Sequence, residues 1–171
     1  MAGMPEGYQT HLPRLMELVN GLATNPEVKY SLHQPWAYAK SAMEEGFANY
    51  GKNQLKMYDA IVETVWAVKE SAQIEGVIPV GTAIQNGRTS YIGESMLRDD
   101  FHLNADVAKF ASACVWFQTL FGQDEVSYSP DNLINYDTKL AKQAAHAAIT
   151  DSKRVTVLEL SLIHISEPTR H

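Results

Sequence analysis

The sequence has one cysteine, few basic residues and no long hydrophobic run. Because Cys114 is the sole cysteine among 171 residues, an internal disulfide and a cysteine-based zinc site are excluded. The 14 Lys and Arg residues form no cluster and are outnumbered by 20 Asp and Glu residues, which argues against a nucleic-acid-binding surface. The longest apolar runs, such as residues 111–117, are too short to span a membrane.

What remains is an ordinary composition for one soluble globular domain, with 45% hydrophobic and 20% charged positions. Residues 1–7 have neither a basic segment nor an apolar one, so no signal peptide is visible. The compartment is therefore left open, and a signal peptide of an exported parent protein would lie upstream of Met1.

The last residues, 160–171, resemble the conceptual translation of a sequencing adapter. We expect them to be a non-native tail and exclude them from the fold, as one excludes an expression tag. The histidines that remain as candidates for chemistry are His11, His33, His102 and His146.

Helical spacing of apolar residues alternates along the chain with short strand-like segments. Helices are predicted at about 12–19, from the N-cap Asn53 to about Ser71, at 105–121 and within 131–150. Strands are predicted at about 28–32 and at 77–80, where Pro79 is expected near the strand end.

This order predicts an α/β fold in which helices cover a parallel sheet. Two strands are too few for such a sheet, since typical sheets have about four to six. We therefore expect part of the sheet to lie outside this chain.

Sites in open α/β sheets collect at the carboxyl ends of the strands. The segment at 98–104 follows the second predicted strand and its connecting residues 81–90, and it places Asp99 three residues before His102. An aspartate so placed can accept the Nδ1 proton and leave Nε2 as a general base. The alternative is a structural histidine that caps the next helix.

The segment 98–104 also resembles the last conserved block of the SGNH/GDSL hydrolases, which is usually Asp-Gly-x-His. The chain also resembles an uncharacterised family of SGNH-hydrolase-like proteins, and this resemblance spans roughly Tyr8 to Gly122. The segments that carry it are 78–90, Trp116-Phe117, 36–38 and 46–51. The resemblance implies a three-layer, flavodoxin-like α/β/α domain with parallel strands. It also implies that Asp99 is the orienting acid and His102 the general base.

The sequence departs from that pattern at two places. Asp100 stands where glycine is usual, and the nucleophile block Gly-Asp-Ser or Gly-Asn-Ser is absent. The two strands match the fourth and fifth of an SGNH sheet, so we expect strands one to three upstream of Met1. Residues 1–122 would then be the carboxyl-terminal half of the domain, and 123–159 a helical C-terminal extension.

Ser95 lies in a segment that is similar to the missing nucleophile block but stands in a different structural context. Gly93-Glu94-Ser95-Met96-Leu97 resembles Gly-Asp-Ser-Leu, but it lies in the loop that leads to His102 rather than on a strand-to-helix turn. We therefore do not expect Ser95 to be the nucleophile.

Four further side chains are candidates for substrate binding. Trp36 and Tyr38 are expected either to form a sugar- or acyl-binding wall or to pack structurally. Asn86 and Arg88 are expected either to contact a polar substrate or to stabilise their loop.

The resemblance implies a parent protein that is a serine esterase or acetyl-hydrolase acting on a small-molecule or carbohydrate ester, without a cofactor. This chain itself, without the serine block, is expected to be inactive. A rival hypothesis is a non-catalytic carbohydrate- or protein-binding module that uses Trp36, Tyr38 and Arg88. A third is a metal site formed by Asp99, Asp100 and His102. The sequence does not indicate an oligomeric state.

Overall fold

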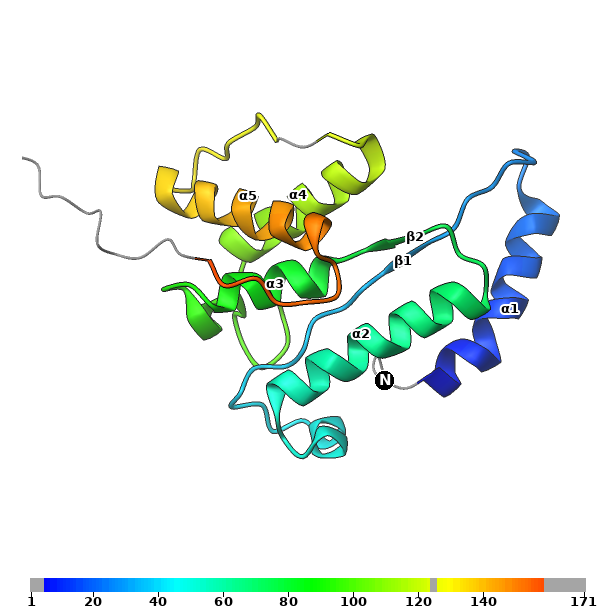
Figure 1. Cartoon of the computed structure of the whole chain (residues 1–171), viewed down its shortest axis with the longest axis horizontal. Helices are drawn as coiled ribbons and strands as arrows, with labels where there is room; N and C mark the ends of the chain where they lie inside the picture. The colour runs from blue at the N-terminus through cyan, green and yellow to red at the C-terminus, as the bar shows by residue number, and fades with distance from the viewer. Residues whose placement is uncertain (1–4, 124–125, 159–171) are drawn as a thin grey trace, which may run out of the picture.

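The computed structural model describes residues 5–123 and 126–158, so the expected non-native tail lies outside the described residues. Two strands lie between groups of helices (Figure 1). The elements in chain order are α1 (Pro5–Leu22), β1 (Ser31–His33), the 3-10 helix η1 (Glu45–Tyr50), α2 (Gln54–Ser71), β2 (Gly76–Ile78), α3 (Val80–Arg88), the 3-10 helix η2 (Gly93–Met96), α4 (Val107–Phe121) and α5 (Asn135–Thr150).

The two strands pair in parallel, which confirms the mixed α/β class and the direction of the predicted sheet. Leu32 of β1 lies opposite Val77 of β2, and His33 lies opposite Ile78. Both strands are three residues long. The second ends before Pro79, which cannot donate a ladder hydrogen bond.

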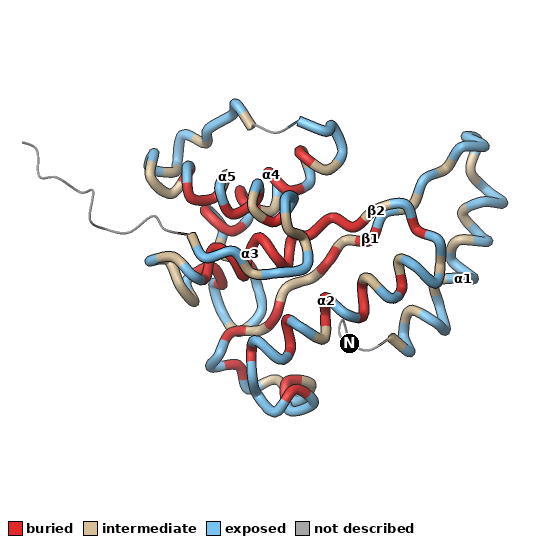
Figure 2. The backbone as a smooth tube through the Cα atoms, viewed as in Figure 1, coloured by how far each residue is buried: buried red, intermediate tan, exposed pale blue. Residues whose placement is uncertain are grey.

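Hydrophobic side chains form a cluster on each side of this sheet. Figure 2 shows buried residues in the helices on both sides of the strands. Leu32 and Val77 pack with α2 and the inner side of α1, whereas Ile78 packs with α3, α4 and α5. Successive residues of a strand point to opposite faces, so Val77 and Ile78 contribute to different clusters. The sheet thus connects two packed halves.

Helix boundaries follow local sequence signals where such signals are strong. The side chain of Asn53 accepts a hydrogen bond from the Lys56 N–H at 3.0 Å, and α2 begins at the next residue. Gly122 takes the left-handed conformation, with φ of 62°, directly after α4. The predicted limits of both helices are confirmed to within two residues.

Residues 81–90 were expected to be a loop, and this prediction is wrong, because most of them form the buried helix α3. The glycines there serve close packing rather than chain flexibility. A Cβ at Gly81 would overlap the carbonyl oxygen of Pro35, and one at Gly87 would lie 2.6 Å from the Met96 methyl carbon. Glycine has a low helix propensity, so the sequence of this segment did not indicate a helix. The glycines are needed because neighbouring atoms leave no room for a Cβ.

The predicted C-terminal extension packs into the core with α3 and α4. Five α5 residues are fully buried there: Leu140, Ala141, Ala144, Ala145 and Ala148. The segment 151–158 then runs back beside α3 (Figure 1). Its Thr156 N–H donates to Asn86 Oδ1 at 2.7 Å, and its Leu158 N–H donates to Thr89 Oγ1 at 2.9 Å.

Candidate functional site

The segment after β1 and the loop before α4 meet at one edge of the molecule. The Ala39 N–H donates to the Asp100 carbonyl at 2.8 Å, and the Trp36 indole N–H donates to the Phe101 carbonyl at 2.7 Å. The Met43 N–H also approaches the Asp100 carboxylate at 3.3 Å. These contacts fasten the Asp99–His102 loop to the segment that follows β1.

The loop is closed at its base by backbone hydrogen bonds. Leu97 and Leu103 form an antiparallel bridge, and the Arg98 N–H donates to the His102 carbonyl at 2.8 Å. Asp100 is absent from the non-glycine residues with positive φ in the described ranges, which are Lys52 and Gln73. The backbone at Asp100 therefore does not need the glycine that usually stands there.

Asp99 and His102 form a direct pair. His102 Nδ1 lies 2.9 Å from Asp99 Oδ2 and 3.2 Å from Oδ1. The backbone N–H groups of His102 and Phe101 donate to Asp99 Oδ1 at 2.7 and 3.1 Å. The carboxylate is thereby fixed in place, and it orients the imidazole with Nδ1 toward the acid and Nε2 away from it.

These donors hold the pKa of Asp99 well below its usual range, with the His102 backbone N–H as the largest cause. The carboxylate therefore stays ionised and can accept the Nδ1 proton. The His102 side chain is 53% exposed, and its Nδ1 faces Asp99. Chemically, this arrangement suits a general base.

A small aromatic hollow lies beside the pair. Its volume is about 210 Å³, and its lining residues are Pro35, Trp36, Tyr38, Gly46, Tyr50, Met57 and Phe101. The centroids of the Phe101 and His102 rings are 4.2 Å apart. The structure thus brings the predicted wall residues Trp36 and Tyr38 together with the predicted acid–base pair.

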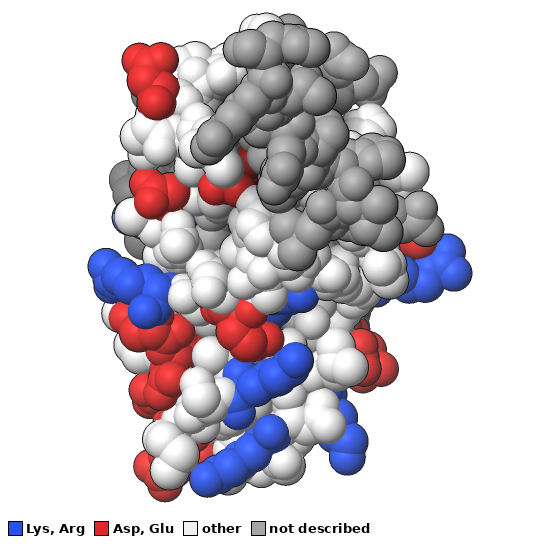
Figure 3. All heavy atoms as spheres, turned by 90° about the vertical axis from the view of Figure 1, so that its left-hand side faces the viewer, with Lys and Arg blue, Asp and Glu red and all other residues white. Residues whose placement is uncertain are grey.

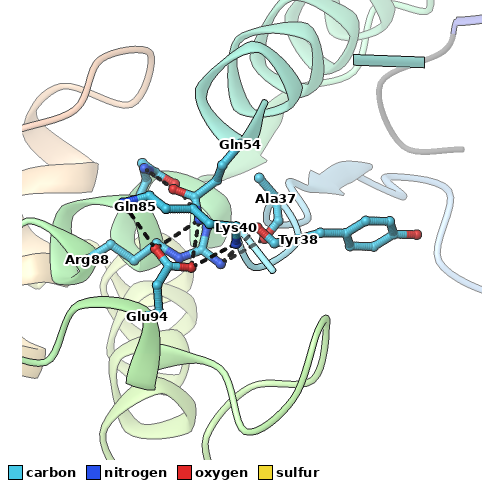
Figure 4. A network of polar contacts seen from close by, with 7 residues as sticks. All are labelled: Ala37, Tyr38, Lys40, Gln54, Gln85, Arg88 and Glu94. Atoms are coloured by element: carbon cyan, nitrogen blue, oxygen red, sulfur yellow. Dashed lines mark hydrogen bonds and ion pairs between the residues drawn. The ribbon is translucent and has the colours of Figure 1, made fainter. Parts of the chain in front are cut away.

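Arg88 lies behind this wall in a buried polar network (Figure 4). Its guanidinium donates to the carbonyls of Ala37 and Tyr38 at 3.0 and 3.3 Å and to Gln85 Oε1 at 3.1 Å. Burial lowers the pKa of Arg88 to about 10, and the charge of Glu94 opposes that change. The Tyr38 ring points away from the network in Figure 4, so Arg88 holds the backbone of the wall.

Two residues of this network, Gln54 and Glu94, were not predicted from the sequence. Gln54 Nε2 donates to Glu94 Oε2 at 2.9 Å and to the Tyr38 carbonyl at 3.2 Å. Glu94 also accepts the Lys40 N–H at 3.1 Å. The contacts join residues at least 16 positions apart, so no local pattern could have revealed them.

The positions of Asn86 and Arg88 favour a structural role for both side chains over contact with a substrate. Asn86 is fully buried, and its side chain donates to the Ala144 carbonyl at 3.3 Å and accepts from Thr156 at 2.7 Å. Arg88 is 8% exposed, with the internal partners given above. Both side chains stabilise structure: Asn86 holds α5 and the C-terminal segment, and Arg88 holds the aromatic wall.

Ser95 and His33, which the sequence analysis considered beside the pair, take no part in it. Ser95 lies in η2 and lines a separate hollow with Asn104 and Asp137. His33 stacks on Trp116 and accepts its indole N–H at 3.1 Å, and burial lowers the pKa of His33. No group of three His, Cys, Asp or Glu side chains that could hold a metal ion occurs within 5–123 and 126–158, so the metal hypothesis lacks support.

Surface properties of the described residues add three observations. On the face in Figure 3, acidic and basic side chains are interspersed rather than gathered into a patch of one sign. Of the helices that the structure describes, none is long and apolar enough to cross a lipid bilayer. A larger hollow of about 960 Å³ lies between α4, α5 and the C-terminal segment, and neither Asp99 nor His102 lines it.

Comparison with known proteins places the chain in a family. A family model described as "Domain of unknown function (DUF4886)" matches residues 1–148. A solved structure of a DUF4886 family protein from Bacteroides uniformis is 40% identical, with a TM-score of 0.87. The alignment covers 92% of this chain and 61% of that one, so the chain spans about three fifths of this relative's length. No curated protein is significantly similar. The chain therefore belongs to the DUF4886 family.

Proposed function

We propose that this DUF4886 domain is part of an SGNH-type hydrolase of acyl esters, in which Asp99 orients His102 and His102 is the general base. The pairing of His102 Nδ1 with Asp99 Oδ2 at 2.9 Å carries the proposal. The half-exposed His102 side chain and the anchored carboxylate support it, because a base needs both a fixed orientation and access to the reacting group. In the same proposal, the helices on the two sides of β1 and β2 are the outer layers of a three-layer SGNH domain.

The proposed reaction is acyl transfer through a serine. His102 Nε2 takes the proton of the serine hydroxyl as Oγ attacks the ester carbonyl. The proton then passes to the leaving alcohol, and water hydrolyses the acyl-enzyme with His102 again as base. We place the serine outside this chain, because the sequence lacks the Gly-Asp-Ser block and covers 61% of its longer relative.

The test is ester hydrolysis by the complete open reading frame that contains this chain. Substituting His102→Ala is expected to lower kcat by about 10²- to 10⁴-fold, the usual contribution of a general base. The matched control is His11→Ala, at an exposed position of α1, which is expected to leave kcat unchanged. An unchanged rate in the His102→Ala protein would overturn the proposal.

The binding-module hypothesis is an outcome of the same experiment. It requires a protein that hydrolyses no ester, with carbohydrate binding that is equal in the wild type and in His102→Ala. Arg88, one of its three proposed contacts, is buried in the internal network, which leaves that module with Trp36 and Tyr38 alone.

A further inference from the structure

We infer that the aromatic hollow beside His102 holds the acyl group of the ester and that it selects short acyl chains. The inference rests on the proposed function, since it assigns one part of the substrate to one place in that site.

The position of the hollow supports an acyl site. Phe101 lines the hollow and its ring lies 4.2 Å, centroid to centroid, from the His102 ring. The hollow therefore begins one side chain away from the proposed base. A group bound in it would bring its attached carbonyl close to the nitrogen that activates the nucleophile.

The chemistry of the lining favours a hydrocarbon over a sugar. A sugar ring needs several hydrogen-bond partners, because each buried hydroxyl without one is costly. The lining includes few polar side-chain atoms, and the Trp36 indole N–H is already used by the Phe101 carbonyl at 2.7 Å. Proline, methionine and aromatic rings form most of the wall, and such surfaces gain free energy by covering methylene groups.

The size and construction of the hollow indicate a short chain. Its volume of about 210 Å³ equals that of about seven water molecules at ~30 Å³ each. Met57 and Tyr50 are 5% and 9% exposed, so the floor is fixed by the core, whereas Phe101 at the rim is 40% exposed. The Arg88 network holds the Tyr38 carbonyl from behind, which limits outward movement of the wall.

A binding experiment on the complete reading frame tests the inference without following turnover. The methyl group of Met57 is the reporter, observed by NMR with ¹³C-methyl-labelled methionine, and butyramide is the uncharged, unreactive probe. We expect a saturable shift of the Met57 signal and none for Met96, which is fully buried in the other cluster. An unmoved Met57 signal, or an equal shift with glucose, would overturn the inference.

A second experiment uses the chain-length preference of the complete reading frame. Tyr38→Ala enlarges the hollow, so kcat/KM for an octanoate ester relative to an acetate ester is expected to rise by about tenfold or more. The control Tyr128→Ala removes a tyrosine that is 66% exposed and does not line the hollow, and it should leave the ratio unchanged.

The two experiments separate this inference from the proposed function. Ester hydrolysis with a ratio that Tyr38→Ala does not change would overturn the acyl site and leave the hydrolase proposal standing. A saturable Met57 shift together with a complete reading frame that hydrolyses no ester would support an acyl-binding hollow and overturn the hydrolase proposal.

Discussion

Replacing Arg88 with methionine is expected to destabilise the protein strongly, although no substrate contact is lost. Methionine keeps most of the apolar stem but removes all the donors of the guanidinium. Two acceptors then lose the guanidinium donor that reaches them, the Ala37 carbonyl at 3.0 Å and Gln85 Oε1 at 3.1 Å. The Tyr38 carbonyl keeps a donor, because Gln54 Nε2 also reaches it at 3.2 Å.

The expected cost follows from these partners. A buried acceptor without a donor costs about 1–3 kcal/mol, so two of them set a range of about 2–6 kcal/mol. Two features of Arg88 lower that figure: its Nε has no hydrogen-bond partner among the described residues, and its charge is desolvated at 8% exposure. We therefore expect Arg88→Met to lower the free energy of unfolding by about 2–4 kcal/mol.

Urea denaturation followed by circular dichroism measures this change. The control Arg154→Met makes the same substitution in an exposed ion pair with Asp151, and it should change the free energy by at most about 0.5 kcal/mol. Arg88→Lys should fall between the two, because an ammonium cannot reproduce the planar fork. If Arg88→Met were as stable as Arg154→Met, the assigned role of the network would be refuted.

Three further predictions address individual residues. Burial raises the pKa of the Cys114 thiol to about 11, so it should not react with Ellman's reagent at pH 8 until the protein unfolds; reaction in native protein would contradict this. The pKa of Asp99 is lowered on folding, so its ionised form stabilises the protein above its unfolded pKa of about 3.9, and the contribution is lost as pH falls below that value. The stability difference between wild type and Asp99→Asn should therefore shrink in acid urea titrations, and a constant difference would disprove the linkage. Gly81→Ala forces a Cβ into the Pro35 carbonyl and should cost about 3 kcal/mol or more, whereas Gly7→Ala on an open helix surface should stabilise by about 0.5–1 kcal/mol; equal melting temperatures would rule this out.

How much of this fold the sequence predicts depends on the range of the interactions involved. Asn53 and Gly122 act on the residues next to them, so the start of α2 and the end of α4 were predicted. The helix α3 was missed because its glycines are explained by Pro35 and Met96, which lie elsewhere in the chain. Local propensity indicated a loop, and tertiary packing determined a helix.

The candidate site likewise combines a contact between residues close in sequence with contacts between distant residues. Asp99 and His102 are three residues apart, and a short loop brings them together through its own backbone N–H groups, so their spacing was informative. The hollow depends instead on Trp36 reaching Phe101 across 65 positions.

The wall of the hollow is supported by a similarly distant contact, that of Arg88 with the Tyr38 carbonyl across 50 positions. A pattern of residue types can thus predict a contact between an aspartate and a histidine that one loop brings together. The pocket beside that pair becomes visible only once the segment after β1 is placed against the loop before α4. For this reason the sequence supports a hypothesis about the reaction, whereas the structure is needed for one about the acyl group.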